Sequence, residues 1–431
     1  MPEPRVSVIV PVYNKASYLA AALDSVLGQT FAGGIELVCV DNGSTDGSLE
    51  ILREYEARLG STTSAVTSFR LIEQDHTGPG VARNAGLDVA QGDYACFLDS
   101  DDFLDVRTFE KAVARADAQG LDILVWDCWY YNDRLQRDQH PPVGTLEFGA
   151  FAPWGDAAER VFRAADNPDA AFTSFQNWPW NKLFRRSFLE EFGLRFPAMF
   201  RTEDLPFCCM AFVRARRMGV LYDRLSHYRI HTGISAMDVK DNHPLDFLEA
   251  FLLLKRELEE AGLYGTYQRS FARWALSGCV YNLDSLRGEG TFSLAFRRLK
   301  EGGLDELGIT DEALEGYGNR FELEALEALR TRDEAGYLRW LANALENVLA
   351  DHRAQVDVLE AERDAERERT DATRRDLQAQ LEDVRRELDE QRDRYDELAA
   401  RHDAMVNSAE YRSGRALCKI PRAIQRRMLG K

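Results

Sequence analysis

The chain has 431 residues, of which 45% are hydrophobic and 29% charged, and its formal net charge at pH 7 is -18. This length predicts two or three domains with enough apolar residues for a core. The acidic balance argues against bulk binding of nucleic acid. The N-terminus has no signal-peptide features, and no stretch reaches the roughly 18 to 20 apolar residues that a membrane-spanning helix needs. We therefore expect a soluble body.

The cysteines form no Cys-x-x-Cys pair, and several fall in apolar, strand-like runs. In such runs cysteine behaves as a small hydrophobic residue. The seven are Cys39, Cys96, Cys128, Cys208, Cys209, Cys279 and Cys418. This usage predicts reduced thiols and a cytoplasmic protein.

Strand-like and helical patterns alternate over the segment 6–129. The β-branched run Val6–Val10 predicts a buried strand that Pro11 ends. Strand patterns recur over 35–40, 69–73, 94–98 and 122–129, with helical patterns over 16–27, from a cap at Asp46 through Leu59, and over 79–90. Because such alternation specifies a sheet covered by helices, we predict a Rossmann-like, doubly wound α/β domain with parallel strands.

Four polar residues, Asp99, Ser100, Asp101 and Asp102, follow directly on the apolar strand 94–98. Ligands of parallel α/β sheets bind beyond the carboxyl ends of the strands, and clustered carboxylates suit a hard divalent cation. An isolated Asp-x-Asp would equally suit a turn or a helix cap. The longer polar run after a buried strand favours a Mn²⁺ or Mg²⁺ site, with Asp101 as the first ligand and Asp99 as the second.

Four motifs occur together in one order: VIVPVYN at 8–14, VDNGSTD at 40–46, ARNAGL at 82–87 and FLDSDD at 97–102. In this order and spacing they resemble the family 2 glycosyltransferases. The resemblance covers residues 5 to 235 and implies a GT-A fold that binds a nucleoside diphosphate sugar, with a UDP-sugar as the expected donor.

The resemblance also implies roles for individual residues. Asp41 matches the acidic residue that contacts the nucleobase or ribose, and Pro11 and Tyr13 match the lining of the base pocket. Asp99 and Asp101 match the family's Asp-x-Asp motif, whose last carboxylate holds a cation that bridges the two phosphates. Such a cation stabilises the leaving diphosphate as the bond to the anomeric carbon breaks.

The third predicted crossover helix opens with Arg83 and Asn84, so their side chains and the helix N-terminus are candidates to meet the sugar or the phosphates. A surface ion pair is the alternative for Arg83. Gly78 and Gly80 give Gly-x-Gly without the third glycine of a dinucleotide fingerprint. An NAD-dependent enzyme is therefore the weaker hypothesis.

A general base is expected at Glu203 and Asp204, which match the place where these transferases keep it. An acceptor hydroxyl must lose its proton as it attacks the anomeric carbon, and one carboxylate suffices for displacement with inversion. Acidic residues also favour the first turn of a helix without any catalytic role. We predict Asp204 as the base, with Glu203 as the alternative.

Several further residues are candidates on the acceptor side. Trp178 and Trp180 suit a sugar platform and core packing equally well. Lys182 follows them, and we expect its ammonium group close to the diphosphate. Arg229 and His231 are candidates to complete the metal or phosphate site.

The pattern changes twice after the α/β region. We predict a GT-A domain at 1–240, an α-helical domain at 241–350, a coiled coil at 351–408 and a basic amphipathic tail at 409–431. Alternate spacings of four and three define the seam, at Leu377, Leu381, Val384, Leu388, Gln391, Tyr395, Leu398, His402 and Met405. A single solvated helix is the alternative for 362–375. The seam predicts a homo-oligomer.

The tail suits an anionic membrane surface, and a disordered tail is the alternative because Pro421 interrupts any long helix. Together these features predict a cytoplasmic, metal-dependent, inverting hexosyltransferase, peripheral at the inner face of the cell membrane. Its acceptor would be a hydroxyl of a glycan or lipid-linked acceptor in cell-surface polysaccharide synthesis. A non-catalytic nucleotide-sugar scaffold working through the coiled coil is the alternative, against which the intact Asp99, Asp101 and Asp204 argue.

Overall fold

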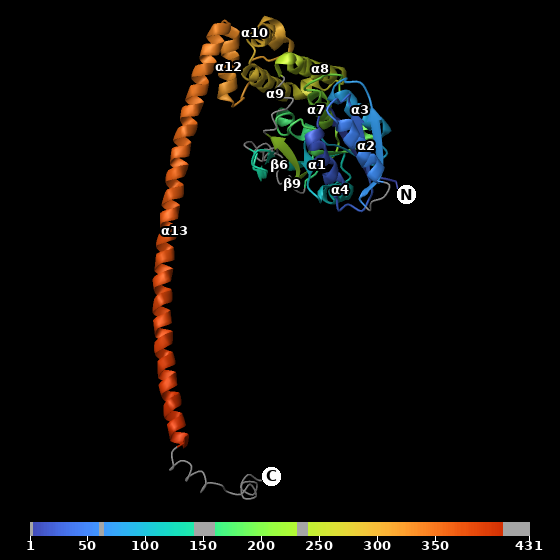
Figure 1. Cartoon of the computed structure of the whole chain (residues 1–431). Coiled ribbons are helices and arrows are strands. Elements are labelled where there is room, and N and C mark those ends of the chain that lie inside the picture. The colour runs from blue at the N-terminus through green and yellow to red at the C-terminus, as the bar shows by residue number, and fades with distance from the viewer. Residues whose placement is uncertain (1–2, 60–63, 142–159, 231–239, 408–431) are drawn as a thin grey trace. The chain divides into compact units, whose positions relative to one another are not determined.

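The computed structural model describes residues 3–59, 64–141, 160–230 and 240–407 (Figure 1). The chain divides into two compact units, Met1–Leu341 and Ala342–Lys431. The first unit holds every strand of the described residues and the helices up to the start of α13. The predicted tail at 409–431 and His231 lie outside the described residues.

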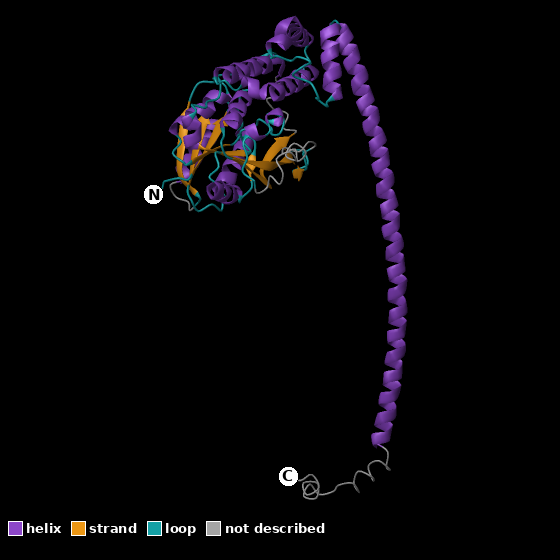
Figure 2. Ribbon diagram, turned by 180° about the vertical axis from the view of Figure 1, so that it is seen from behind, coloured by secondary structure: helices purple, strands orange, loops and turns teal. Residues whose placement is uncertain are grey.

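One mixed sheet of nine strands forms the centre of the first unit (Figure 2). Its order is β3-β2-β1-β4-β8-β6-β9-β5, with β7 paired to β6. The strands are β1 (Val6–Val12), β2 (Ile35–Asp41), β3 (Val66–Glu73), β4 (Tyr94–Phe97), β5 (Phe103–Leu104), β6 (Ile123–Asn132), β7 (Arg137–Gln139), β8 (Lys182–Arg185) and β9 (Met218–Ile230). β7 forms an antiparallel hairpin with the end of β6.

The first four strands in this order are parallel, as the alternating pattern predicts. Helices α1 (Ala16–Leu27), α2 (Ser48–Leu59), α3 (Pro79–Val89) and α4 (Thr108–Gln119) alternate with the strands of this region. Every residue of β1 and β2 is buried, because strands covered on both faces meet no water. The α/β prediction is confirmed for this half of the sheet.

The predicted end of the first strand at Pro11 is wrong. β1 continues to Val12, and Pro11 lies opposite Val40 in the β1–β2 register. The carbonyl of Ile9 accepts a hydrogen bond from the backbone N–H of Leu98, so the polar backbone groups of Ile9 face β4. Pro11 is two residues further along the strand, so its backbone faces the same side. The missing N–H of Pro11 therefore faces the side where β4 has already ended at Phe97, so no sheet hydrogen bond is lost.

The parallel prediction is also wrong beyond β4. β8 pairs antiparallel with both β4 and β6, and β5 pairs antiparallel with β9, whereas β6 and β9 are parallel. A short apolar run does not indicate whether its strand will be parallel or antiparallel to its neighbours, because that direction depends on the connections between the strands.

The helices that follow the sheet share its core. They are α6 (Arg186–Glu191), α7 (Asp204–Arg214), α8 (Asp246–Glu260), α9 (Tyr264–Ser285), α10 (Glu289–Arg298), α11 (Leu304–Glu306) and α12 (Arg320–Thr331). One cluster of buried side chains runs from Ile9 and Phe97 in the sheet to Leu254 and Leu326 in these helices. At the predicted boundary near residue 240 the chain thus changes from mixed α/β to helical structure, while the hydrophobic core continues across it.

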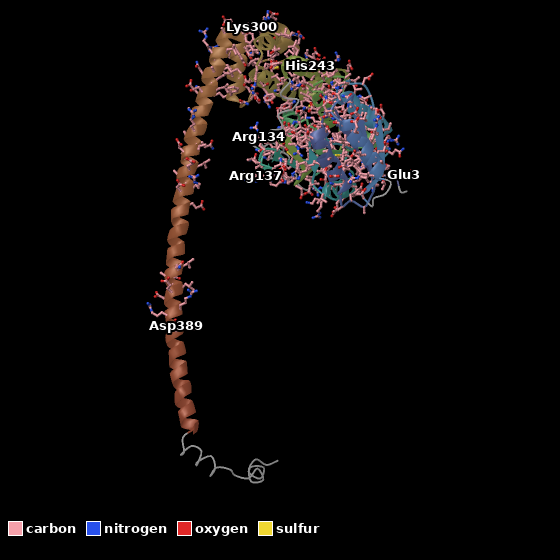
Figure 3. The ribbon with its side chains drawn as sticks, in the orientation of Figure 1. Glu3, Arg134, Arg137, His243, Lys300 and Asp389 are labelled. Carbon is pink, nitrogen blue, oxygen red and sulfur yellow. The ribbon has the colours of Figure 1, made fainter. Side chains whose placement is uncertain are left out.

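Helix α13 (Glu334–Asn407) begins in the first unit and continues through the second. Leu377, Leu381 and Leu388 are 59%, 50% and 66% exposed along it, and Leu388 precedes the Asp389 labelled in Figure 3. Within the described residues, no helix is both long and apolar enough to cross a membrane.

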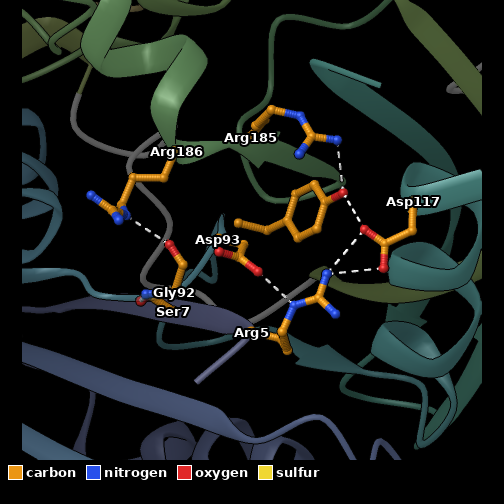
Figure 4. Close-up of polar contacts among 8 residues, drawn as sticks. Arg5, Ser7, Gly92, Asp93, Asp117, Arg185 and Arg186 are labelled. Carbon is orange, nitrogen blue, oxygen red and sulfur yellow. Dashed lines mark hydrogen bonds and ion pairs between the residues drawn. The ribbon is translucent and has the colours of Figure 1, made fainter. Parts of the chain in front are cut away.

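A polar network ties the amino ends of the parallel strands together (Figure 4). Arg5 donates to Asp93 at 2.6 Å and to Asp117 at 2.9 Å. Tyr94 donates to Asp117 at 2.7 Å and accepts from Arg185 at 2.9 Å. This network occupies the amino edge, so the carboxyl edge of the same strands remains available for a ligand.

Candidate active site

Asp41, the last residue of β2, is buried at the carboxyl edge. Its Oδ2 accepts hydrogen bonds of 3.2 Å from the backbone N–H groups of Gly43 and Ser44. Its Oδ1 is also buried and has no partner among the described residues. Because a buried carboxylate oxygen without a donor is costly, this atom suits a ligand that brings its own N–H or O–H, such as a nucleobase or a ribose.

An aromatic row lies beside this carboxylate. Tyr13 stacks on His76 with ring centroids 3.8 Å apart, and His76 contacts Phe200 at 5.5 Å. The side chain of Asn42 is fully used inside the chain, since its amide contacts His76 and its oxygen accepts from the backbone of Thr77. His76 and Phe200 were missed by the sequence analysis, because they come from loops whose partners are distant in sequence.

The acidic turn after β4 is held by Arg229. The backbone N–H of Arg229 donates to Asp102 at 2.8 Å, and its guanidinium donates to the carbonyl of Asp101 at 2.8 Å and to Asp133 at 2.6 Å. The guanidinium also lies over the rings of Tyr18, Phe103 and Tyr131. Arg229 therefore has its polar groups committed to shaping the turn.

Both predicted metal ligands contact a cation of the chain. Lys15 donates to Oδ2 of Asp101 at 2.6 Å, and Arg83 donates to Oδ1 of Asp99 at 2.8 Å. Lys15 was not a candidate in the sequence analysis. The neighbouring Asp102 is buried, and burial together with the charges of Asp101 and Asp99 raises the pKa of its carboxyl well above the usual value.

The donor set fits a divalent cation that shares its coordination with a substrate. Within the described residues, no three His, Cys, Asp or Glu side chains group closely enough to hold a metal alone. Mg²⁺ commonly takes only one or two carboxylates and completes its shell with substrate phosphates and water. Asp102 also has a buried Oδ2 without a partner among the described residues. Asp99 and Asp101 are the residues that would hold such an ion.

Arg83 joins the two sides of the site. It is 5% exposed, and while one of its terminal nitrogens binds Asp99, the other donates to Oε1 of the buried Glu203. The two carboxylates raise the pKa of Arg83 against the effect of burial, so the guanidinium keeps its charge. The alternative of a surface ion pair is wrong, because the pair is buried and its partner Glu203 is far away in sequence.

Replacing Arg83 with Met is expected to lower the free energy of unfolding by about 3–5 kcal/mol, because Glu203 would stay buried without its cation. Urea unfolding followed by circular dichroism measures this loss. The double variant Arg83→Met with Glu203→Gln is the control and should recover part of the stability. Equal losses in the single and double variants would mean that lost packing, not the uncompensated charge, is responsible.

Asp204 begins α7 directly after Glu203 and is only partly buried. Burial, with the neighbouring Glu203 carboxylate as the second cause, raises the pKa of Asp204 to about 7. Glu203 is committed to Arg83, whereas Asp204 forms no ion pair with a described residue within 4.0 Å. Of the two carboxylates, Asp204 is the one suited to accept a proton near neutral pH.

Two residues that we predicted to contact the sugar donor, Asn84 and Lys182, form hydrogen bonds within the chain. The amide of Asn84 exchanges hydrogen bonds of 2.8 and 2.9 Å with the backbone of Phe196. Lys182 is fully buried, and its ammonium donates to the carbonyls of Gln176 and Trp178 and to Asn181. Burial lowers its pKa to about 8. Both side chains support loops of the site, and their contacts with a donor stay predictions.

Trp178 and Trp180, the aromatic pair predicted on the acceptor side, differ in their burial. Trp180 is 3% exposed, whereas Trp178 is partly buried. The two rings stack 4.9 Å apart, and Trp180 stacks on Tyr228 at 5.3 Å. Trp180 therefore packs in the core, and Trp178 is the ring that a ligand can reach.

The family comparison agrees with this geometry. Residues 7–193 match the family model described as glycosyl transferase family 2. The chain is 32% identical over 227 residues to the uncharacterized glycosyltransferase EpsJ of Bacillus subtilis, covering 52% of this chain and 61% of that protein. It is 28% identical over 264 residues to the poly(ribitol-phosphate) beta-N-acetylglucosaminyltransferase TarS of Staphylococcus aureus, covering 60% of this chain and 41% of that protein. The matches thus cover 61% of the length of EpsJ and 41% of the length of TarS.

Solved structures show the same fold. The crystal structure of S. aureus TarS 1-349 in complex with UDP-GlcNAc superposes with a TM-score of 0.57 and 22% identity, covering 77% of this chain and 89% of that chain. A second crystal structure of S. aureus TarS gives the same TM-score, with 54% of that chain covered. This similarity confirms the α/β GT-A part of the fold prediction.

Proposed function

We propose that this chain is a family 2 glycosyltransferase, which transfers a sugar from a nucleoside diphosphate sugar to a hydroxyl group with inversion at the anomeric carbon. The match of residues 7–193 to the family model supports this proposal. A UDP-sugar is the proposed donor, and the complex of TarS with UDP-GlcNAc supports this choice. The acceptor we propose is a glycan or lipid-linked chain of a cell-surface polymer. The polymer in the name of TarS supports this acceptor class.

One observation carries the proposal of an enzyme rather than a scaffold. The guanidinium of Arg83 contacts Asp99 on the donor side and Glu203, the neighbour of Asp204, on the other side. The predicted diphosphate site and the predicted base are therefore held within the reach of one side chain. A scaffold that only binds a nucleotide sugar needs no base beside the diphosphate.

The proposed mechanism assigns each step to residues described above. Asp41 and Tyr13 receive the nucleoside, with Pro11 supporting the base pocket. Asp204 accepts the proton of the acceptor hydroxyl as its oxygen attacks the anomeric carbon from the face opposite the leaving group. A divalent cation held by Asp99 and Asp101 would supply the charge that stabilises the leaving diphosphate.

A thermal-shift screen tests the proposal, using UDP, GDP and a panel of nucleotide sugars with Mn²⁺. A ligand present at 100 times its Kd stabilises the folded chain by about 2.7 kcal/mol, so UDP should raise the Tm. The stabilising sugar nucleotide is then incubated with and without acceptor, and release of UDP is measured. Stabilisation without any UDP release would favour the scaffold, and no stabilisation by any nucleotide would reject both proposals.

The exposed leucines of α13 support a second proposal, that two copies of the chain pair through this helix. Leu381 and Leu388 are seven residues apart, and Leu377 lies four residues before Leu381, which is the spacing of a coiled-coil seam. Replacing Leu381 and Leu388 with Asp should convert a dimer to a monomer in light scattering. The matched control changes Ala379 and Arg386, which lie on the opposite side of the helix, to Asp. A monomeric unaltered chain would contradict the pairing.

For the tail at 409–431 we propose contact with the inner face of the cell membrane, on the basis of its basic and apolar residues. Two tails held together by the seam would make the second contact intramolecular and so raise the apparent affinity. Pelleting with anionic liposomes, compared between the full chain and a chain ending at Ser408, measures this. Equal pelleting would contradict it.

A further inference from the structure

A small hollow lies between the loop that precedes α7 and helices α8 and α9. Its lining includes Arg201, Thr202, Lys240, His243, Asp246 and Asn282. His243 is labelled in Figure 3. The cavity volume is about 10 Å³, which is room for one water-sized group. The hollow therefore admits a single oxygen atom and excludes a sugar ring.

Two cations, Arg201 and Lys240, line this hollow. In the described parts of the chain, no Asp or Glu oxygen lies within 4.0 Å of the charged nitrogens of Arg201 or Lys240. Lys240 is 5% exposed, its ammonium donates to the hydroxyl of Ser285 at 2.7 Å, and it lies 3.8 Å from the ring centroid of Tyr281. An ammonium that is buried, and that has a hydroxyl and a ring as its partners among the described residues, favours an added anion.

The side chains that line the hollow carry more positive than negative charge, and Glu203 outside the lining also acts on Arg201 electrostatically. Asp246 accepts a hydrogen bond from the backbone of Arg201 and lies 3.7 Å from His243. Two cations thus face one carboxylate. Burial, with the charge of Arg201 as the second cause, lowers the pKa of Lys240 to about 8. An anion of one negative charge would balance the lining and raise the pKa of Lys240 towards its ordinary value.

The position of the hollow connects it with the acceptor side. Arg201 is three residues before Asp204, so their Cα atoms are at most roughly 11 Å apart. Thr202 between them has a φ of +62°, an uncommon conformation for a β-branched residue and one that is concentrated at functional sites. Phe200 stacks on His243 at 5.2 Å. The loop that presents the candidate base therefore also contributes Arg201 and Thr202 to the lining of the hollow.

We propose that this hollow binds one anionic oxygen of a phosphodiester in the acceptor, through Arg201 and Lys240. The inference rests on the proposed transferase function and names its acceptor class, a polymer with phosphodiester links. The bound phosphate would place a neighbouring hydroxyl of the same repeating unit beside Asp204. Such positioning converts a bimolecular encounter into a fixed orientation.

The test measures binding and turnover separately, on the full chain. Glycerophosphoglycerol, a soluble phosphodiester, is titrated by calorimetry at low ionic strength in the presence of saturating UDP. The variants are Arg201→Gln and Lys240→Met, which keep most of the side-chain volume, and Tm is measured for each. Lys255→Met is the matched control, because Lys255 also lies over a tyrosine ring, Tyr264 at 5.2 Å, in the same helical region.

We expect both hollow variants to bind the phosphodiester roughly tenfold more weakly or worse, because each removes a charge-assisted hydrogen bond. UDP affinity should stay unchanged in all variants, and Lys255→Met should behave as the unaltered chain. Unchanged phosphodiester affinity in both hollow variants, or displacement of the probe by UDP, would overturn the inference. If the chain does not bind UDP at all, the proposed function is rejected. The phosphodiester titration without UDP would still show whether the hollow binds the anion.

If Lys240→Met does not fold, Arg201→Gln alone decides the inference, because Arg201 is only partly buried. A neutral polyol without the phosphate, diglycerol, is the second probe. It should bind equally weakly to the unaltered chain and to the variants. Binding of diglycerol as tight as that of the phosphodiester would show that the hollow does not recognise charge and would overturn the inference.

Discussion

Asp204→Asn is expected to lower kcat by roughly 10² to 10⁴-fold, the usual contribution of a general base, while the affinity for UDP stays unchanged. The amide has nearly the same shape but cannot accept the acceptor's proton. Steady-state kinetics with the donor found in the thermal-shift screen measures the loss. Glu203→Gln is the comparison, and an active Asp204→Asn beside an inactive Glu203→Gln would reverse the assignment. Normal turnover in both variants would place the base elsewhere.

The pKa of Asp204 adds a pH dependence to this prediction. A base works when it is unprotonated, so kcat/KM should fall as the pH drops below about 7. The raised pKa also means that ionising Asp204 destabilises the folded chain relative to the unfolded chain, where the group ionises at its ordinary value of 3.8. Asp204→Asn should therefore have a higher Tm than the unaltered chain at pH 8. The difference should disappear at pH 4, and a difference that is independent of pH would contradict the assigned pKa.

Asp101→Asn is expected to abolish transfer and to weaken the binding of Mn²⁺ in the presence of UDP by at least roughly tenfold, because a charged oxygen ligand is lost. The fold should remain intact, since the partly exposed pair with Lys15 contributes only about 0–1 kcal/mol. Calorimetric titration of Mn²⁺ gives a measurement that is independent of activity. EDTA should abolish transfer by the unaltered chain, and full activity in EDTA would contradict the cation's role.

Two further variants separate the cation from the ion pair. Asp88→Asn removes an exposed carboxylate that pairs with Arg195 at 3.2 Å on the far end of α3, so it should leave both activity and Mn²⁺ binding unchanged. Lys15→Met removes the partner of Asp101 without removing the carboxylate. If Lys15→Met loses Mn²⁺ binding as fully as Asp101→Asn, the ion pair rather than a metal ligand explains the defect.

The sequence by itself determined most helices and strands of the parallel half of the sheet and predicted the edge that carries the candidate site. The predicted helix at 16–27 has the same bounds as α1, and the predicted strands at 35–40 and 94–98 agree with β2 and β4 to within one residue at either end. These elements follow from apolar periodicity, which is local. The acidic turn at Asp99 to Asp102 was found for the same reason, because polar residues directly after a buried strand lie at its carboxyl end.

Only the tertiary structure decided which charges meet. Arg83 and Glu203 are 120 positions apart, and nothing in either local segment predicts that one guanidinium joins Asp99 to Glu203. This contact commits Glu203 to Arg83, whereas burial raises the pKa of Asp204 to about 7. Tertiary structure also decided the strand direction beyond β4. It likewise decided the three hydrogen bonds that Lys182 donates within the chain and the ion pair between Lys15 and Asp101. They depend on long-range packing and burial, whereas periodicity and turn residues report only on neighbours in the chain.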